Sequence, residues 1–149
     1  MNRHLYLRAY MAGIVLPTVF LLIVVSALAL VRVARHESLP IGPDLIFPMA
    51  IVPNVFGLWD MLYVKLHQRW QHPIGLHGAA LPFFIGPAGF AFATATGIAR
   101  LQNGHIVYFE LYWIPYWYFL IAPFIALAVY YLVWKYVVGY FNRVLELPT

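Results

Sequence analysis

Four long apolar segments dominate this sequence and leave few folds open to the chain. They cover residues 9–33, 45–64, 74–99 and 112–138. An α-helix needs about 20 residues to cross roughly 30 Å of hydrocarbon, and each segment is close to that length or longer. The segments are continuously apolar, whereas the strands of a membrane barrel would be shorter and alternate in polarity. We therefore predict an all-α integral membrane protein with four transmembrane helices.

The composition supports this class and narrows the functions open to the chain. Hydrophobic residues make up 64% of the 149 residues and charged residues 9%, a balance typical of membrane proteins. We expect one domain, residues 1–149, without a separate soluble catalytic domain. The sequence has no cysteine, which excludes disulfides, thiolate nucleophiles and iron–sulfur clusters. The net charge of +4 is scattered rather than clustered, so the expected partner is the lipid bilayer and not nucleic acid.

The positions of lysine and arginine predict the orientation of the helices. Flanking basic residues favour the cytoplasmic side of a membrane. The amino terminus, the second loop and the carboxyl terminus share one side and are richer in basic residues than the first and third loops. We therefore predict a multi-pass protein of the inner cell membrane with both termini in the cytoplasm. The richer side has Arg3, Arg8, Lys65, Arg69, Lys135 and Arg143, and the other side has Arg32, Arg35 and Arg100.

Two short motifs recur at matching positions in the two halves of the chain. "GIVLP" at residues 13–17 returns as "GAALP" at residues 78–82, and "IVP" at 51–53 returns as "IAP" at 121–123. A duplicated helical hairpin would give such a pattern, with the two copies running in the same direction as a parallel repeat. Gly, Leu and Pro are common in membrane helices, so chance recurrence is the alternative.

Prolines lie within or at the ends of all four predicted helices. Each proline removes a backbone hydrogen-bond donor and kinks or breaks a helix. The prediction is a Pro-kinked bundle, in which the kinks either open a cavity near the midplane or reflect ordinary packing irregularity. The prolines concerned are Pro17, Pro48, Pro53, Pro82, Pro87, Pro115 and Pro123.

Small residues recur at helical spacing in the third segment. Gly89, Ala93 and Gly97 form one stripe, and such rows let helix backbones approach closely. The stripe predicts tight packing, either inside the monomer or across a homo-oligomer or a larger membrane partner.

Asn54 is the deepest strongly polar residue in the predicted bundle. It follows Pro53 and lies about 14 Å along the second helix, near the bilayer midplane. A polar group at that depth requires a hydrogen-bond partner, which is another helix, a carbonyl freed by Pro53, or a ligand.

Asp60 raises a similar choice nearer the cytoplasmic end of the same helix. It lies about 7.5 Å along the axis from Lys65, so a hydrated pair with Lys65 or Arg69 is one interpretation. The other is a carboxylate that faces the bundle and binds a substrate or a coupling ion. The hydrated pair is narrowly favoured over the carboxylate that faces the bundle. Tyr63 and His67 follow on roughly the same face, which suggests a proton-responsive column.

Aromatic residues crowd the entrance to the fourth segment. Eight of the twelve residues of "YFELYWIPYWYF", at positions 108–119, are aromatic. An interfacial aromatic belt is the first interpretation. A cation-attracting vestibule formed by Glu110 and neighbouring rings, Tyr116 among them, is the second, because ring faces and a carboxylate both favour cations.

The histidines do not suggest a metal or haem site. All of them lie in predicted flanks, loops or first turns, whereas haem between helices needs imidazoles facing one another inside the bundle. We predict no metal and no cofactor. The sequence also lacks a nucleophile and base, or paired carboxylates, at one depth, so an enzyme is the least favoured class.

The function predicted from these features is binding or transport of a small or amphipathic ligand within the bundle. Its candidate ligand-binding residues are Asn54, Asp60, Tyr63, His67, Glu110 and Tyr116. The alternative is a structural or assembly subunit that docks a larger membrane partner through small-residue helix faces.

Overall fold

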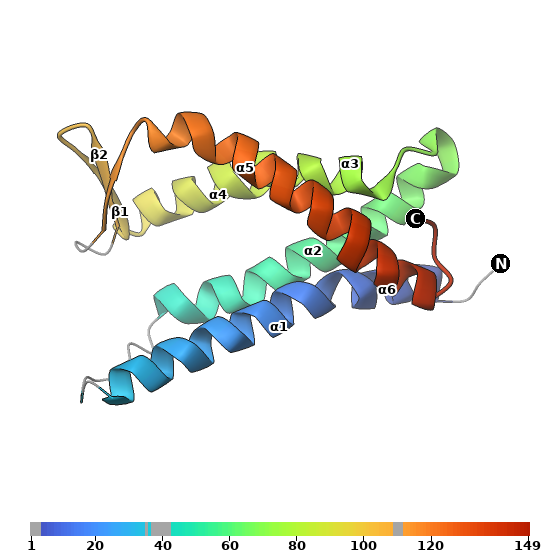
Figure 1. Cartoon of the computed structure of the whole chain (residues 1–149), viewed down its shortest axis with the longest axis horizontal. Helices are drawn as coiled ribbons and strands as arrows, with labels where there is room; N and C mark the ends of the chain where they lie inside the picture. Colours follow the sequence, from blue (N-terminus) through green and yellow to red (C-terminus); the bar gives the residue numbers. More distant parts are fainter. Residues whose placement is uncertain (1–3, 35, 37–42, 109–111) are drawn as a thin grey trace. The chain divides into compact units, whose positions relative to one another are not determined.

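The computed structural model describes residues 4–34, 36, 43–108 and 112–149 (Figure 1). The chain divides into two compact units, one formed by Met1–His72 and Val137–Thr149 and the other by Pro73–Tyr136. Most of the described residues are helical, in agreement with the sequence prediction. The elements in chain order are α1 (Leu5–Ala34), α2 (Pro43–Trp70), α3 (Ile74–Ala80), α4 (Pro82–Ala95), β1 (Ala99–Gln102), β2 (His105–Tyr108), β3 (Tyr112–Pro115), α5 (Tyr118–Leu132), the π-helical η1 (Val133–Val138) and α6 (Gly139–Val144).

Among the described residues, three helical stretches are long and apolar enough to cross a membrane. They are Leu5–Val31 in α1, Ile74–Ala95 across α3 and α4, and Tyr118–Val144 from α5 to α6. α2 is also long, but it contains polar residues such as Asn54, Asp60 and Lys65, and it does not reach the same apolarity over its described residues. The three stretches are compatible with a membrane protein, and the fourth span remains a prediction.

The first unit is built on α1 and α2, which run side by side (Figure 1). Their backbones nearly touch where Gly13 meets α2, because a Cβ on Gly13 would lie 2.6 Å from the carbonyl oxygen of Phe56. Ala9 and Ala12 on the same helix are fully buried. Small side chains on α1 therefore allow α1 and α2 to pack closely. The sequence predicted this kind of packing for the third segment instead.

The second unit packs α3 and α4 against α5. The closest contact involves Gly78, where a Cβ would lie 1.9 Å from Cγ of Trp134. Trp134 lies in η1 and is fully buried. Gly75, one turn earlier in α3, faces the ring of Tyr131 in the same way. Glycines on α3 thus make room for two aromatic rings.

The third predicted helix, residues 74–99, is divided in the structure. α3 stops at Ala80 and α4 starts at Pro82, whose ring nitrogen cannot donate the hydrogen bond that a continuous helix would need. α4 then ends at Ala95, followed by Gly97 with a φ of 75°. The prediction of a helix from residue 74 is confirmed to Ala95, with an interruption of the hydrogen-bond pattern at Leu81, and its extension to residue 99 was wrong.

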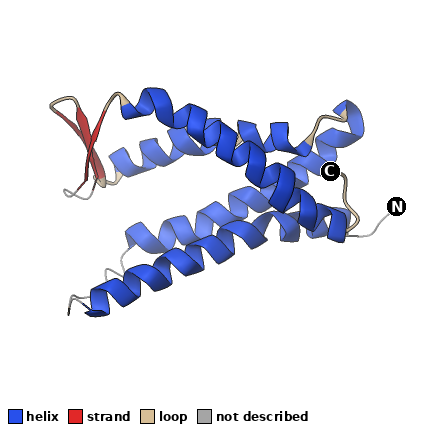
Figure 2. Cartoon of the chain, viewed as in Figure 1, coloured by secondary structure: helices blue, strands red, loops and turns tan. Residues whose placement is uncertain are grey.

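The segment after α4 forms a three-stranded antiparallel sheet in the order β1-β2-β3 (Figure 2). β1 and β2 are joined by Asn103 and Gly104, with φ values of 46° and 78°. Positive φ at both central residues is the backbone of a tight hairpin turn. Residues 112–115 are β3, and α5 begins only at Tyr118. The all-α prediction was therefore wrong here, and so was a fourth helix beginning at residue 112.

The small-residue stripe of the third segment does not form one helix face. Ala93 is buried against Ala99 and Ile106 of the sheet. Gly89 has open space where a Cβ would be, and Gly97 lies beyond the end of α4. The turn after Ala95 changes the direction of the chain, which separates residues that a straight helix would have aligned.

Five of the seven prolines lie inside described helices, as the sequence predicted: Pro17 in α1, Pro48 and Pro53 in α2, Pro87 in α4 and Pro123 in α5. Pro115 instead ends the strand β3. Each unit contains one helical hairpin, α1 with α2 and α3–α4 with α5. The duplication of the hairpin stays a prediction.

Candidate functional site

Asp60 and Asn142 form a fully buried polar pair inside the first unit. Asp60 comes from the carboxyl-terminal half of α2 and Asn142 from α6, and both side chains have 0% exposure. Nδ2 of Asn142 donates a hydrogen bond of 3.1 Å to Oδ1 of Asp60. The same Nδ2 also faces the carbonyl oxygen of Pro148 at 3.4 Å. This pair joins residues that are 82 positions apart in the sequence.

One oxygen on each side chain has no hydrogen-bond partner. Oδ2 of Asp60 and Oδ1 of Asn142 are both buried without a donor among the described residues. A buried acceptor without a partner loses the hydrogen bonds that water would give it, and this destabilises the fold by about 1–3 kcal/mol. Two such oxygens lie on side chains that are already hydrogen-bonded to each other, which makes this pair the candidate site.

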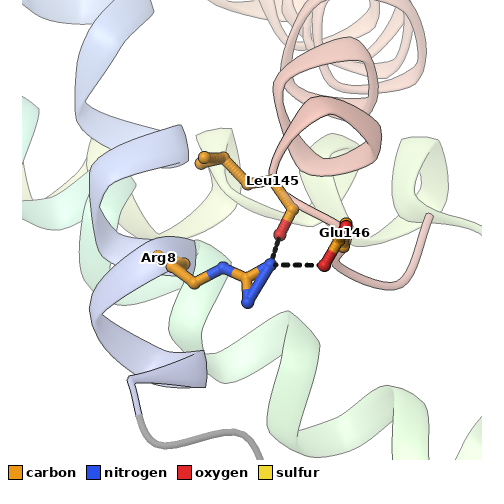
Figure 3. A network of polar contacts seen from close by, with 3 residues as sticks. All are labelled: Arg8, Leu145 and Glu146. Atoms are coloured by element: carbon orange, nitrogen blue, oxygen red, sulfur yellow. Dashed lines mark hydrogen bonds and ion pairs between the residues drawn. The ribbon is translucent and has the colours of Figure 1, made fainter.

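The carboxyl-terminal tail, residues 145–149, is tied to the amino-terminal helix near this pair (Figure 3). The guanidinium group of Arg8 on α1 donates to the carbonyl oxygen of Leu145 and lies 3.3 Å from Oε2 of Glu146. The backbone nitrogen of Leu147 donates to the carbonyl oxygen of Asn142 at 2.8 Å. Together with the contact from Asn142 to Pro148, these bonds fix the tail in the first unit.

The expected hydrated pair between Asp60 and Lys65 is not what the structure contains. Asp60 is fully buried, while Lys65 and Arg69 are exposed. Among the described residues, no cation forms an ion pair with Asp60, and Arg8 is engaged by the tail instead. The narrow preference for an interfacial pair was therefore wrong, because Asp60 is buried and α6 supplies Asn142 as its hydrogen-bond partner.

Tyr63 and His67 come together as the sequence suggested. The hydroxyl group of Tyr63 lies 3.0 Å from Nδ1 of His67, and the His72 carbonyl oxygen is within 3.5 Å of both side chains. Tyr63 is fully buried one turn after Asp60. The structure thus places a buried carboxyl, a buried phenol and a half-buried imidazole along one stretch of α2.

Asn54 serves the contact between α1 and α2. Its Oδ1 accepts a hydrogen bond from the hydroxyl group of Tyr10, and its Nδ2 donates to the carbonyl oxygen of Ala50. The side chain therefore has a partner on another helix and a partner on its own. This arrangement is the first alternative for Asn54, a hydrogen bond to a neighbouring helix.

The described residues of the aromatic stretch lie at the end of β2, in β3, in the turn after it and at the start of α5. Glu110 lies outside the described residues, so the vestibule prediction is not addressed there. Tyr116 is exposed, and its backbone nitrogen donates to the carbonyl oxygen of Gly104 at 3.1 Å. Tyr116 therefore closes the sheet against the β1–β2 turn through its backbone.

The part of the chain that the structure describes contains no group of three His, Asp or Glu side chains arranged to hold a metal ion. Comparisons of the chain with protein-family models, curated proteins and solved structures found no match.

The sequence analysis missed Asn142, the partner of Asp60. Asn142 lies in "GYFNRV", just beyond the fourth predicted segment, where a polar residue passes as part of a helix flank. The available signal was that a buried carboxyl group needs a polar partner. Asn142 is a neutral amide within a largely apolar helix, and such a residue is a natural candidate for that partner.

Proposed function

We propose that this chain is a multi-pass membrane protein that binds, and carries across the bilayer, a small amphipathic cation at Asp60. The observation that supports this proposal is the fully buried carboxyl group of Asp60, one oxygen of which has no partner among the described residues. Ionisable residues inside membrane helices are costly to bury, and they usually mark a substrate or ion pathway.

The chemistry around Asp60 favours a cation with an apolar body. A buried carboxylate requires a positive partner, and the described part of the unit provides none. Tyr63 adds an aromatic ring one turn away, and the buried side chains of α1 and α2 are mainly apolar, among them Ala9, Ala12, Phe56 and Val64. Aromatic faces attract cations, and apolar walls favour a hydrophobic ligand body.

Entry of a ligand requires movement, since Asp60 has no exposed surface. The segment at residues 145–149 is the element suited to move, because it lies outside the helices and is held by few hydrogen bonds. It is held by Arg8 and by the contacts of Asn142 described above. Release of these few bonds would open the face of α2 that bears Asp60.

The membrane part of the proposal includes α2 as a fourth span and both termini in the cytoplasm. Large apolar side chains are exposed on α1 and α5, for example Phe20, Leu30, Leu120 and Phe124, as expected for helices that face lipid. We expect a reporter fused after Thr149 to be cytoplasmic and reporters inserted near Gly42 or Asn103 to be external. The reverse labelling would contradict this topology, and replacing Arg3 and Arg8 with neutral residues should weaken it.

Binding of tetraphenylphosphonium, an amphipathic cation, to the purified full-length protein tests the function. We expect saturable binding by calorimetry in detergent and an affinity at least about tenfold lower in Asp60→Asn, because the charge partner is lost. Asp44→Asn is the matched control, since it makes the same change at the other aspartate, which precedes Asp60 by 16 residues on α2, about 24 Å along the helix axis. Equal affinity in the native protein and Asp60→Asn, an equal loss in Asp44→Asn, or no binding at all would contradict the proposal.

The rival function, a structural subunit, has one observation in its favour. Gly86 and Gly89 on α4 have no atom within 4 Å of the position that a Cβ would take, which leaves part of that helix bare. A partner helix could approach closely there. Gly89→Leu would then reduce the mass of a purified assembly in detergent, whereas the binding function leaves that mass unchanged.

A further inference from the structure

We propose that Asp60 and Asn142 form a proton-binding site, in which a proton on Oδ2 of Asp60 is donated to Oδ1 of Asn142. The inference rests on the proposed function in taking Asp60 as the binding residue, and it identifies the proton as the occupant of Asp60 when no cation is bound. It follows from the two oxygens that lack partners and from the orientation of the amide between them.

The orientation of the Asn142 amide is fixed by its neighbours. An amide NH₂ group has two hydrogens to donate, and Nδ2 lies near two acceptors, Oδ1 of Asp60 and the carbonyl oxygen of Pro148. Turning the amide over would place its oxygen against both acceptors. The oxygen of Asn142 therefore needs a donor, and the amide group itself cannot supply one.

A protonated Asp60 supplies that donor from the side chain already in contact. The amide N–H donates to Oδ1 of the acid, and the acid O–H on Oδ2 donates to Oδ1 of the amide. This closes a ring of two hydrogen bonds between a carboxylic acid and an amide. One proton thereby satisfies both buried oxygens, and the pair carries no net charge in apolar surroundings.

Several charged and titratable groups of the unit have partners other than Asp60, and Lys65 and Arg69 on α2 are exposed. On α1, Arg8 bonds to the tail, and the hydroxyl group of Tyr10 bonds to Asn54. On α6, Nε of Arg143 donates to the carbonyl oxygen of Gly139 at 3.3 Å. On α2 itself, the hydroxyl group of Tyr63 lies beside His67. Among the described residues no cation competes with a proton for Asp60.

Two other occupants would satisfy the same oxygens. A water molecule can donate to both while Asp60 stays ionised, and a small metal cation can bind both. A metal cation in a site of hard oxygen ligands takes about six of them. The pair offers two, and no cluster of acidic or histidine side chains lies nearby among the described residues. A water leaves a charge buried without a counter-ion, which is the more costly arrangement.

Infrared difference spectroscopy of the purified full-length protein tests the inference without any ligand. The chain has five acidic residues, so few carboxyl bands contribute. At pH 7 we expect the C=O band of a protonated carboxylic acid, shifted by exchange into D₂O. The band should be lost in Asp60→Asn and displaced in Asn142→Leu, which removes its hydrogen-bond partner. Asp60→Asn should fold, because an amide at position 60 also donates to Oδ1 of Asn142.

A labelling experiment keeps the test independent of that variant. Asp44 and Asp60 are the two aspartates in the sequence, so carboxyl-¹³C aspartate in Asp44→Asn leaves Asp60 as the labelled acid. A labelled carboxylate band at pH 7 in place of the acid band would overturn the inference and indicate a bridging water or cation. An acid band in a protein that does not bind tetraphenylphosphonium would support the proton site and contradict the proposed function alone.

Discussion

Gly78→Leu is expected to destabilise the protein by at least about 3 kcal/mol, at or beyond the upper end of ordinary overpacking effects. A Cβ at this position would lie 1.9 Å from Cγ and 2.3 Å from Cβ of Trp134. Both atoms lie close to the backbone of Trp134, so a change of its side-chain rotamer moves them little. Trp134 is also fully buried, so its ring cannot move aside. Either α3 separates from α5 or the second unit fails to pack.

Gly86→Leu is the matched control, because Gly86 lies on the adjoining helix α4 and has nothing within 4 Å of its Cβ position. Leucine also forms helix more readily than glycine, by up to about 1 kcal/mol. We therefore expect Gly86→Leu to melt at the native temperature or slightly above it. Thermal unfolding in detergent, followed by tryptophan fluorescence, compares the two variants. Native-like melting of Gly78→Leu would show that Trp134 does not pack against α3.

The helices were predictable from the sequence because apolar length is a strong signal. The segments at residues 9–33 and 45–64 correspond to α1 and α2, whose observed bounds extend further into polar flanks. The end of a helix is harder to predict where polar residues flank it, because such residues are compatible with both a helix and a loop. The break at Pro82 was also available in principle, because a proline that lacks the N–H donor often marks a helix start.

The sheet was missed although the sequence carries its turn signal. Asn103 and Gly104 stand between two short runs with β-branched and aromatic residues, and Asn-Gly is the strongest short-range signal for a hairpin. Because the flanking segments are apolar, residues 74–99 and 112–138 were predicted to be helices and the residues between them a loop. A dipeptide that favours positive φ at both positions should have outweighed it.

The partner of Asp60 was not predictable from local pattern. Asn142 is brought to Asp60 by packing of α6 on the first unit, over a sequence separation of 82 residues. Helical periodicity places residues on faces of one helix, but it gives no information about which distant helix covers a face. Tyr63 and His67 were found because they are four residues apart on one helix.

The central claim is that one carboxyl group holds either a proton or the ligand cation. Two ligands that exclude each other at one residue are coupled, and the coupling acts equally in both directions. Binding of tetraphenylphosphonium should therefore release about one proton from the protein wherever Asp60 is protonated beforehand. Over that range, the affinity for the cation should rise about tenfold for each unit of pH, since fewer protons compete.

The most direct test is to count the protons released when the full-length protein, in weakly buffered detergent solution at pH 7, is saturated with tetraphenylphosphonium. We predict about one proton per bound cation for the native chain and for Asp44→Asn, and none for Asp60→Asn. Calorimetry in two buffers of different ionisation enthalpy gives the same number independently. Cation binding to the native protein without proton release, or equal release from Asp60→Asn, would contradict the account.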